Sequence, residues 1–139
     1  MAIPAATKRL VFARANGYCE YCRLHLDYSS SPYCMEHIQP RQKSGTDDPD
    51  NLALACLGCN GIKHTKTTAP DYETDTVASI FNPRIEAWGA HFAWDPSFLY
   101  IVGLTPVGRA TVVALHLNRT ALVNIRRALI LCGEHPPEE

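Results

Sequence analysis

The sequence has no long apolar run and no excess of charge of one sign. No stretch of its 139 residues is long and apolar enough to cross a bilayer, so we expect no membrane segment. Lys8 and Arg9 are not followed by the apolar stretch of a secretory signal, which favours a cytoplasmic protein. The formal net charge is -1, whereas a protein that binds DNA tightly and without sequence preference usually has an excess of basic residues.

Residues 17–75 are also poor in the apolar runs from which a hydrophobic core is built. They are polar and rich in turn residues, and a segment of this kind usually requires a structural metal. The chain has six cysteines, enough for three disulfides in a secreted scaffold, but four of them form two CxxC pairs. Without a secretory signal, this pattern favours zinc in a reducing compartment. We expect the other two, Cys34 and Cys132, to be small buried hydrophobic residues.

The two CxxC pairs predict a structural zinc site. A CxxC turn presents two thiolates to one ion, and two such turns close a tetrahedral site with no open position. A thioredoxin-like redox pair is the alternative, but two pairs are present and no βαβ pattern supports it. The predicted ligands of Zn²⁺ are Cys19, Cys22, Cys56 and Cys59.

A second set of polar residues lies between and just after the cysteine pairs. Its members are Glu36, His37, Asn51, Asn60 and His64. We predict short strands at residues 33–39 and 51–55 and a helix at residues 56–66. Asn60 and His64 are four positions apart on that helix and therefore share one face. A carboxylate from the neighbouring strand completes a half-shell of oxygen and nitrogen ligands for a hard divalent metal.

Such a half-shell leaves positions for water and a phosphate oxygen, which suits Lewis-acid catalysis on a phosphodiester. His37 is then free to accept the proton of an attacking water. Adjacent strand residues point to opposite faces, so Glu36 and His37 reach one site only if the strand twists or ends there, and Pro40 is consistent with an end. We expect Asn51 to hold this irregular backbone with side-chain hydrogen bonds.

Three basic residues near this set are candidate substrate contacts. Arg41 either contacts a DNA phosphate or pairs with Asp47 or Asp48. Lys63 and Lys66 either contact phosphate or lie on a solvated helix face. The sequence leaves each pair of alternatives open.

The flanking segments have weaker patterns. Residues 6–16 predict a short helix with Leu10, Ala13 and Phe12 facing inward. Residues 67–78 read as irregular, and residues 91–94 and 98–104 as a hairpin. Two C-terminal helices follow. One starts at Thr105 and Pro106, as an N-cap and first helical residue, and the other spans residues 120–132.

The two motif sets together resemble the HNH endonuclease family, specifically its four-cysteine, zinc-containing branch. The resemblance covers about 50 residues and rests on Cys19-Glu20-Tyr21-Cys22, Glu36-His37-Ile38-Gln39-Pro40-Arg41, the run Asn51 to Asn60, and Lys63-His64. It implies a ββα-metal fold that cuts DNA, often as a nick. The stretch from Phe81 to Val112 is similar to the C-terminal extension of one bacterial subgroup of these nucleases.

By this resemblance, His37 is the general base and Asn51 orients the active-site loop. Glu36, Asn60 and His64 match the positions of the metal ligands. Many members have histidine at the position of Asn60. Amide-oxygen ligation there favours Mg²⁺ or Mn²⁺ over a softer metal.

We therefore expect an α+β fold with a zinc-stapled ββα-metal core at residues 1–75. A C-terminal extension at residues 76–139, made of a hairpin and two helices, is expected to pack on that core. The predicted function is metal-dependent hydrolysis of DNA phosphodiester bonds, with RNA left open as a substrate. The alternative is a non-catalytic, zinc-containing nucleic-acid-binding or adaptor module, which needs only the cysteines. The sequence leaves open whether the protein is a monomer or a homodimer.

Overall fold

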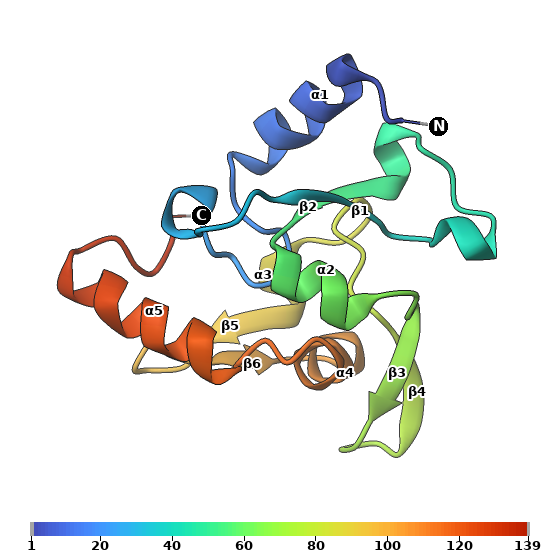
Figure 1. Cartoon of the computed structure of the whole chain (residues 1–139). Coiled ribbons are helices and arrows are strands. Elements are labelled where there is room, and N and C mark those ends of the chain that lie inside the picture. Colours follow the sequence, from blue (N-terminus) through green and yellow to red (C-terminus); the bar gives the residue numbers. More distant parts are fainter. Residues whose placement is uncertain (1, 139) are drawn as a thin grey trace. The chain divides into compact units, whose positions relative to one another are not determined.

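The computed structural model describes residues 2–138, which form α-helices and three two-stranded antiparallel sheets (Figure 1). The predicted α+β class is confirmed. The contacts between residues divide the chain into two compact units. Unit 1 comprises the residues up to Thr67 together with Asn82–Glu86, and unit 2 comprises Thr68–Phe81 and the residues from Ala87 onward. No helix among the described residues has the length and hydropathy needed to cross a bilayer.

Unit 1 is a β-hairpin flanked by two helices. Its elements are α1 (Ala5–Ala15), β1 (Cys34–His37), β2 (Leu52–Ala55) and α2 (Leu57–Lys63). The strands are antiparallel, with Cys34 opposite Ala55 and His37 opposite Leu52, and all four residues of β2 are buried. Helix α1 packs against β2, and α2 packs against β1. Three 3₁₀ turns connect these elements: η1 (Leu26–Tyr28), η2 (Arg41–Lys43) and η3 (Pro49–Asn51).

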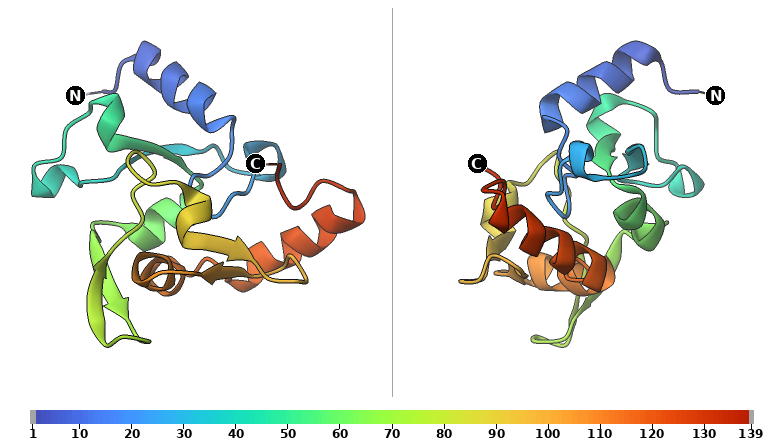
Figure 2. Two further views of the ribbon diagram at one scale, coloured as in Figure 1. Left: turned by 180° about the vertical axis from the view of Figure 1, so that it is seen from behind. Right: turned by 60° about the vertical axis from the view of Figure 1, so that its left-hand side comes forward.

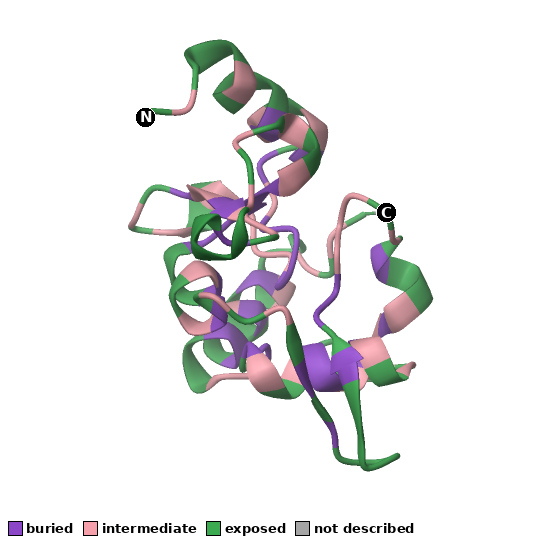
Figure 3. Ribbon diagram, turned by 90° about the vertical axis from the view of Figure 1, so that its right-hand side faces the viewer, coloured by how far each residue is buried: buried purple, intermediate pink, exposed green. Residues whose placement is uncertain are grey.

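Helix α1 buries a different face from the one predicted. Val11 and Ala15 are its buried residues, whereas Leu10 is 48% exposed and Ala13 is also exposed. Figure 3 shows α1 mostly in the colours of exposed and intermediate residues. The helix is held at its C-terminal end, where Arg14 donates hydrogen bonds of 2.6 Å to the carbonyls of Pro49 and Leu52. This anchor selects the inward face, and a weakly amphipathic sequence does not reveal it.

Unit 2 contains two β-hairpins and three helices. The second hairpin and the two C-terminal helices were predicted correctly, and Thr105 caps its helix through a 3.0 Å hydrogen bond from the Gly108 amide. Cys132 is exposed rather than buried, and Cys34 in unit 1 is half-buried. The elements of unit 2 are β3 (Thr68–Asp71), β4 (Thr76–Ser79), α3 (Trp88–His91), β5 (Phe92–Trp94), β6 (Ile101–Gly103), α4 (Pro106–Ala114) and α5 (Thr120–Leu131).

The hairpin β3–β4 is the main element that the sequence did not predict. Residues 67–78 were expected to be irregular. Pro70 lacks an amide donor, and proline is unusual inside a strand. In the structure Pro70 pairs with Val77 in a two-stranded sheet, where one side of each strand needs no ladder partner. Figure 2 shows this hairpin extending past helix α4, against which both of its strands pack.

A buried ion pair joins this hairpin to α4. The Nε and Nη2 atoms of Arg109 each donate to a carboxylate oxygen of Asp71 at 3.0 Å, and the Thr74 hydroxyl donates at 2.7 Å. These hydrogen bonds, the one from Arg109 foremost, hold the pKa of Asp71 well below its usual range. A carboxylate of this kind stabilises the fold above the pKa of the unfolded chain, about 3.9, and the contribution is lost as the pH falls through the folded-state pKa.

We predict that Asp71→Asn lowers the midpoint of thermal unfolding at about pH 7, and that its difference from the parent shrinks below about pH 4. Circular dichroism melts across this pH range provide the measurement. Glu73→Gln is the control, because Glu73 contacts the same guanidinium at 3.1 Å from an exposed position and should contribute little. A difference between Asp71→Asn and the parent that does not change with pH would contradict the assignment.

Candidate functional site

Four buried cysteines of unit 1 lie together. Cys19 and Cys22 follow α1, Cys56 caps the N-terminus of α2, and Cys59 lies within that helix. Their sulfur atoms all lie within 4.8 Å of one another, and those of Cys22 and Cys56 are 3.8 Å apart. A tetrahedral ion with Zn–S bonds of about 2.3 Å places its sulfurs about 3.8 Å apart. The donor set therefore fits a structural zinc ion, and no other such grouping of three or more cysteine, histidine or carboxylate ligands occurs in residues 2–138.

The electrostatics of this cluster also fit a cation. Hydrogen bonds with Cys19, together with burial, raise the pKa of Cys22 and of Cys59 well above the usual value. Hydrogen bonds with the neighbouring thiols, with that of Cys19 foremost, lower the pKa of Cys56. A thiolate at Cys56 thus makes the thiols of Cys22 and Cys59 harder to ionise, and a coordinated divalent ion removes that conflict.

A buried glutamate holds the first cysteine pair against β2. The amide of Glu20 donates to the Leu54 carbonyl, and the Glu20 carboxylate accepts from the Leu54 amide, each at 2.9 Å. Arg84 forms an ion pair with the other oxygen of this carboxylate. Because β2 leads directly into Cys56, these bonds bring the two cysteine pairs together. The sequence did not predict this role for Glu20, since the residues between the two cysteines of a CxxC pair follow no helix or strand periodicity.

The second predicted set gathers around a small open hollow. Its volume is about 200 Å³, and it is lined by residues of unit 1 alone. Four of the five members of the set line it, and Asn51 lies outside the lining. The lining residues are Glu36, His37, Pro40, Arg41, Gln42, Asn60, His64 and Thr65. Glu36 and His37, adjacent in sequence, both line the hollow because β1 ends at His37.

Asn51 fastens the chain that leaves β1. Its Oδ1 accepts from the Gln39 amide at 2.8 Å, and its Nδ2 donates to the carbonyls of Gln39 and Thr46 at 3.0 and 2.8 Å. The prediction that Asn51 holds this irregular backbone is confirmed. The side chain thereby fixes the loop that carries Asp47.

Asp47 binds two residues of the hollow at once. Its Oδ1 lies 2.8 Å from Nε2 of His37 and accepts from Nη2 of Arg41 at 2.9 Å. Of the two alternatives for Arg41, the structure therefore contains the pairing with Asp47. Hydrogen bonds from His37 and then Arg41 lower the pKa of Asp47, which keeps it ionised at neutral pH. An ionised acceptor at Nε2 favours the histidine tautomer with its proton there, which leaves Nδ1 free to accept one.

Glu36 lies deeper, in a buried polar cluster. The Tyr21 hydroxyl donates to its Oε2 at 2.7 Å, and Nζ of Lys63 lies 2.6 Å from its Oε1. Burial raises the pKa of Glu36, and the ammonium of Lys63 opposes that shift. Lys63 also donates to the carbonyls of His37 and Ile38 at 3.3 and 3.1 Å.

The prediction that Lys63 contacts phosphate or lies on a solvated face is wrong. Its side chain is 1% exposed, and its three donors are used by Glu36 and two backbone carbonyls. Helix α2 packs against β1, and the buried side chain of Lys63 reaches the carbonyls of His37 and Ile38 at the end of that strand. Lys66 is exposed, and its Nζ donates to the Ile62 carbonyl at 2.8 Å.

Helix α2 is shorter than predicted, since it ends at Lys63 rather than at Lys66. His64 is therefore its C-cap, with φ 49° and ψ −117°, and does not share a helical face with Asn60. Both residues nevertheless line the hollow, with Asn60 half-buried and His64 exposed. A backbone at this φ and ψ is strained for a non-glycine residue and persists only where the surroundings impose it.

The buried position of Lys63 generates a stability prediction. Lys63→Met leaves the carboxylate of Glu36 buried without its cation, which should lower the free energy of unfolding by about 3–5 kcal/mol. Lys66→Met, at the exposed end of the same segment, should change it by less than about 0.5 kcal/mol. Urea unfolding of zinc-loaded protein measures both values. Equal stability of the two variants would mean that Lys63 is solvated.

A comparison with protein-family models matches residues 19–66 to the HNH endonuclease family. Comparisons with curated proteins and with solved structures gave no match. The matched segment contains both cysteine pairs, the histidine–aspartate pair and every residue that lines the small hollow. The segment from Cys19 to Lys66 therefore matches the HNH endonuclease family, and its grouped cysteines fit the zinc-containing branch.

Proposed function

We propose that this protein is an endonuclease that hydrolyses DNA phosphodiester bonds with the help of a divalent metal. The observation that carries the proposal is the hollow in which His37, oriented by Asp47, lies beside Asn60 and His64. A zinc module without catalysis needs the four cysteines alone. It gives no reason for an oriented imidazole and further ligands at the mouth of an open hollow.

The proposed base is Nδ1 of His37. It accepts the proton of a water molecule as the water attacks phosphorus, a role worth roughly 10²–10⁴-fold in rate. Asp47 holds the ring through Nε2 and stabilises the positive charge that the imidazole acquires. Asn51 supports this pair indirectly by fixing the loop that carries Asp47.

Glu36, Asn60 and His64 are the residues that would hold the catalytic ion. Their oxygen and nitrogen donors fit Mg²⁺ or Mn²⁺, which when bound supplies positive charge for the phosphate and the leaving oxygen. Glu36 would contribute one of its remaining lone pairs, because Tyr21 and Lys63 use only one site on each carboxylate oxygen. Lys63 thus has a supporting role, in keeping this buried carboxylate ionised.

DNA is the proposed substrate, and RNA is the alternative that the same chemistry admits. Arg41 and Lys66 are the proposed phosphate contacts. Arg41 is exposed and lines the hollow, and Lys66 is exposed just after the end of α2. With few cationic contacts, binding should weaken as salt rises. A reducing setting such as the cytoplasm would keep the cysteines as thiolates for zinc.

The backbone conformation of His64 allows the effect of its side chain on cleavage to be separated from its effect on the stability of the fold. Glycine adopts φ 49° and ψ −117° without strain, whereas alanine does not. We predict that His64→Gly and His64→Ala both lose most cleavage, and that the glycine variant is the more stable by about 1 kcal/mol. Plasmid cleavage and urea unfolding are the two measurements. Cleavage by His64→Gly at the parent's rate would remove His64 from the metal site.

The central test is cleavage of supercoiled plasmid by zinc-loaded protein with added Mg²⁺ or Mn²⁺. We predict that the parent cuts only when the metal is added, and that His37→Ala cuts roughly 10²–10⁴-fold more slowly. Asp47→Asn should also be impaired, because it no longer favours the reactive tautomer. Asp48→Asn is the matched control, since the carboxylate of Asp48 accepts from the hydroxyl of Thr46 in its own turn.

Two results would contradict the proposal. Equal cleavage by the parent and His37→Ala would show that the base is misassigned or that the activity is a contaminant. Folded, zinc-loaded protein that binds DNA but cuts neither DNA nor RNA would favour the non-catalytic module.

A further inference from the structure

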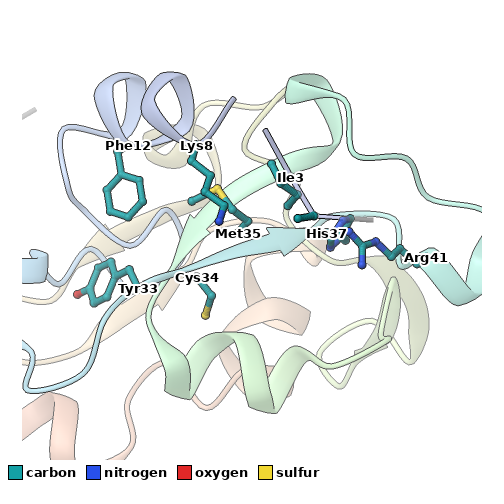
Figure 4. Close-up of a pocket in the computed structure, with 9 residues that line it drawn as sticks. Ile3, Lys8, Phe12, Tyr33, Cys34, Met35, His37 and Arg41 are labelled. Carbon is teal, nitrogen blue, oxygen red and sulfur yellow. The ribbon is translucent and has the colours of Figure 1, made fainter. Parts of the chain in front are cut away.

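A larger hollow lies between α1 and β1 in unit 1. Its volume is about 450 Å³, within the range of roughly 300–1,000 Å³ that is usual for ligand clefts. Figure 4 shows Lys8 and Phe12 reaching from α1 towards the strand that carries Met35 and His37. His37 and Arg41 line both this hollow and the smaller one. The two hollows are therefore neighbours that share the proposed base.

The local geometry of two elements builds this hollow. Tyr33, Met35 and His37 alternate along β1 and its start, so they share the strand face opposite Glu36. Lys8 and Phe12 are four positions apart and share one face of α1. The hydroxyl of Tyr33 donates to the Leu24 carbonyl at 2.6 Å, which holds its ring in place.

The lining combines an apolar surface with positive charge. Phe12, Tyr33 and Met35 supply aromatic and thioether groups, and Lys8 and Arg41 supply cations. No described residue of the lining is acidic. Cations alone would suffice to contact the phosphates of a duplex. An aromatic surface beside them suits a base whose face is free to stack, and the bases of a regular duplex are already stacked on one another.

We propose that the hollow between α1 and β1 binds an unpaired nucleotide next to the phosphate that is cut. The base would stack on Phe12, and Lys8 would contact the adjoining phosphate. Because the hollow shares His37 with the smaller one, this placement of the cut rests on the proposed function. The subsite gives the protein a preference for nucleic acid with single-stranded character beside the cleavage position.

The test compares binding of one labelled oligonucleotide as a single strand and as a duplex. Fluorescence anisotropy of zinc-loaded protein without added Mg²⁺ or Mn²⁺ measures binding apart from cleavage. Phe12→Ala should weaken single-strand binding roughly 10-fold and leave duplex binding within about 2-fold. Leu10→Ala is the matched control, because Leu10 is an exposed apolar residue of the same helix outside the hollow. Phe12→Leu, which keeps the bulk without the aromatic face, should behave like Phe12→Ala even if alanine weakens the helix.

The salt dependence tests the phosphate contact. Lys8→Gln should reduce the slope of log K against log salt for the single strand by about 0.7, the loss of one phosphate contact. Arg9→Gln, an exposed neighbour outside the hollow, should change it less. Equal slopes for these two variants would overturn the role of Lys8.

Parallel cleavage assays separate this proposal from the proposed nuclease. Plasmid cleavage by the parent, with single-strand binding that is indifferent to Phe12 substitution, would retain the nuclease and overturn the subsite. Phe12-dependent single-strand binding without any cleavage would support the subsite and overturn the nuclease. An equal loss of single-strand and duplex binding in Phe12→Leu would also overturn the subsite.

Discussion

The four-cysteine cluster is the constraint on which the rest of unit 1 depends. It ties the turn after α1 to the start of α2. Glu20 reinforces this tie through β2, and the fully buried strand then leads straight into Cys56. The position of α2 relative to β1, and hence of Asn60 and His64 relative to His37, follows from this closure. A cysteine cluster that fits a structural metal thus sets the geometry of the small hollow, to which none of the four cysteines contributes.

Strand β1 serves a different purpose on each face. One face presents Glu36 to Tyr21 and Lys63, in a buried cluster whose charges compensate each other. The other face presents Met35 and His37 to the larger hollow beside α1. Because the strand ends at His37, that imidazole also reaches the smaller hollow. The proposed base consequently lies between the buried Glu36–Lys63 ion pair and the open hollow.

Two features of the site lower the stability of the fold. His64 occupies a backbone conformation that glycine adopts more easily, and Glu36 is a carboxylate raised in pKa by burial. Lys63 compensates the second of these, and no described contact relieves the first. Local rules of sequence and structure are usually broken at functional sites. This is a physical reason, beside the motif itself, to assign chemistry to the hollow.

The sequence alone determined the cysteine cluster, the β-hairpin followed by a helix, and the way Asn51 holds the chain after β1, because motif spacing carries that information directly. The hairpin β3–β4, the inward face of α1 and the burial of Lys63 were decided by tertiary contacts. The same holds for the pairing of His37, the last residue of β1, with Asp47 in the loop that follows. Pro70 is tolerated in a strand, and Lys63 is tolerated in the interior, only because of the residues that surround them. Such positions are set by packing and charge compensation, which local sequence patterns do not encode.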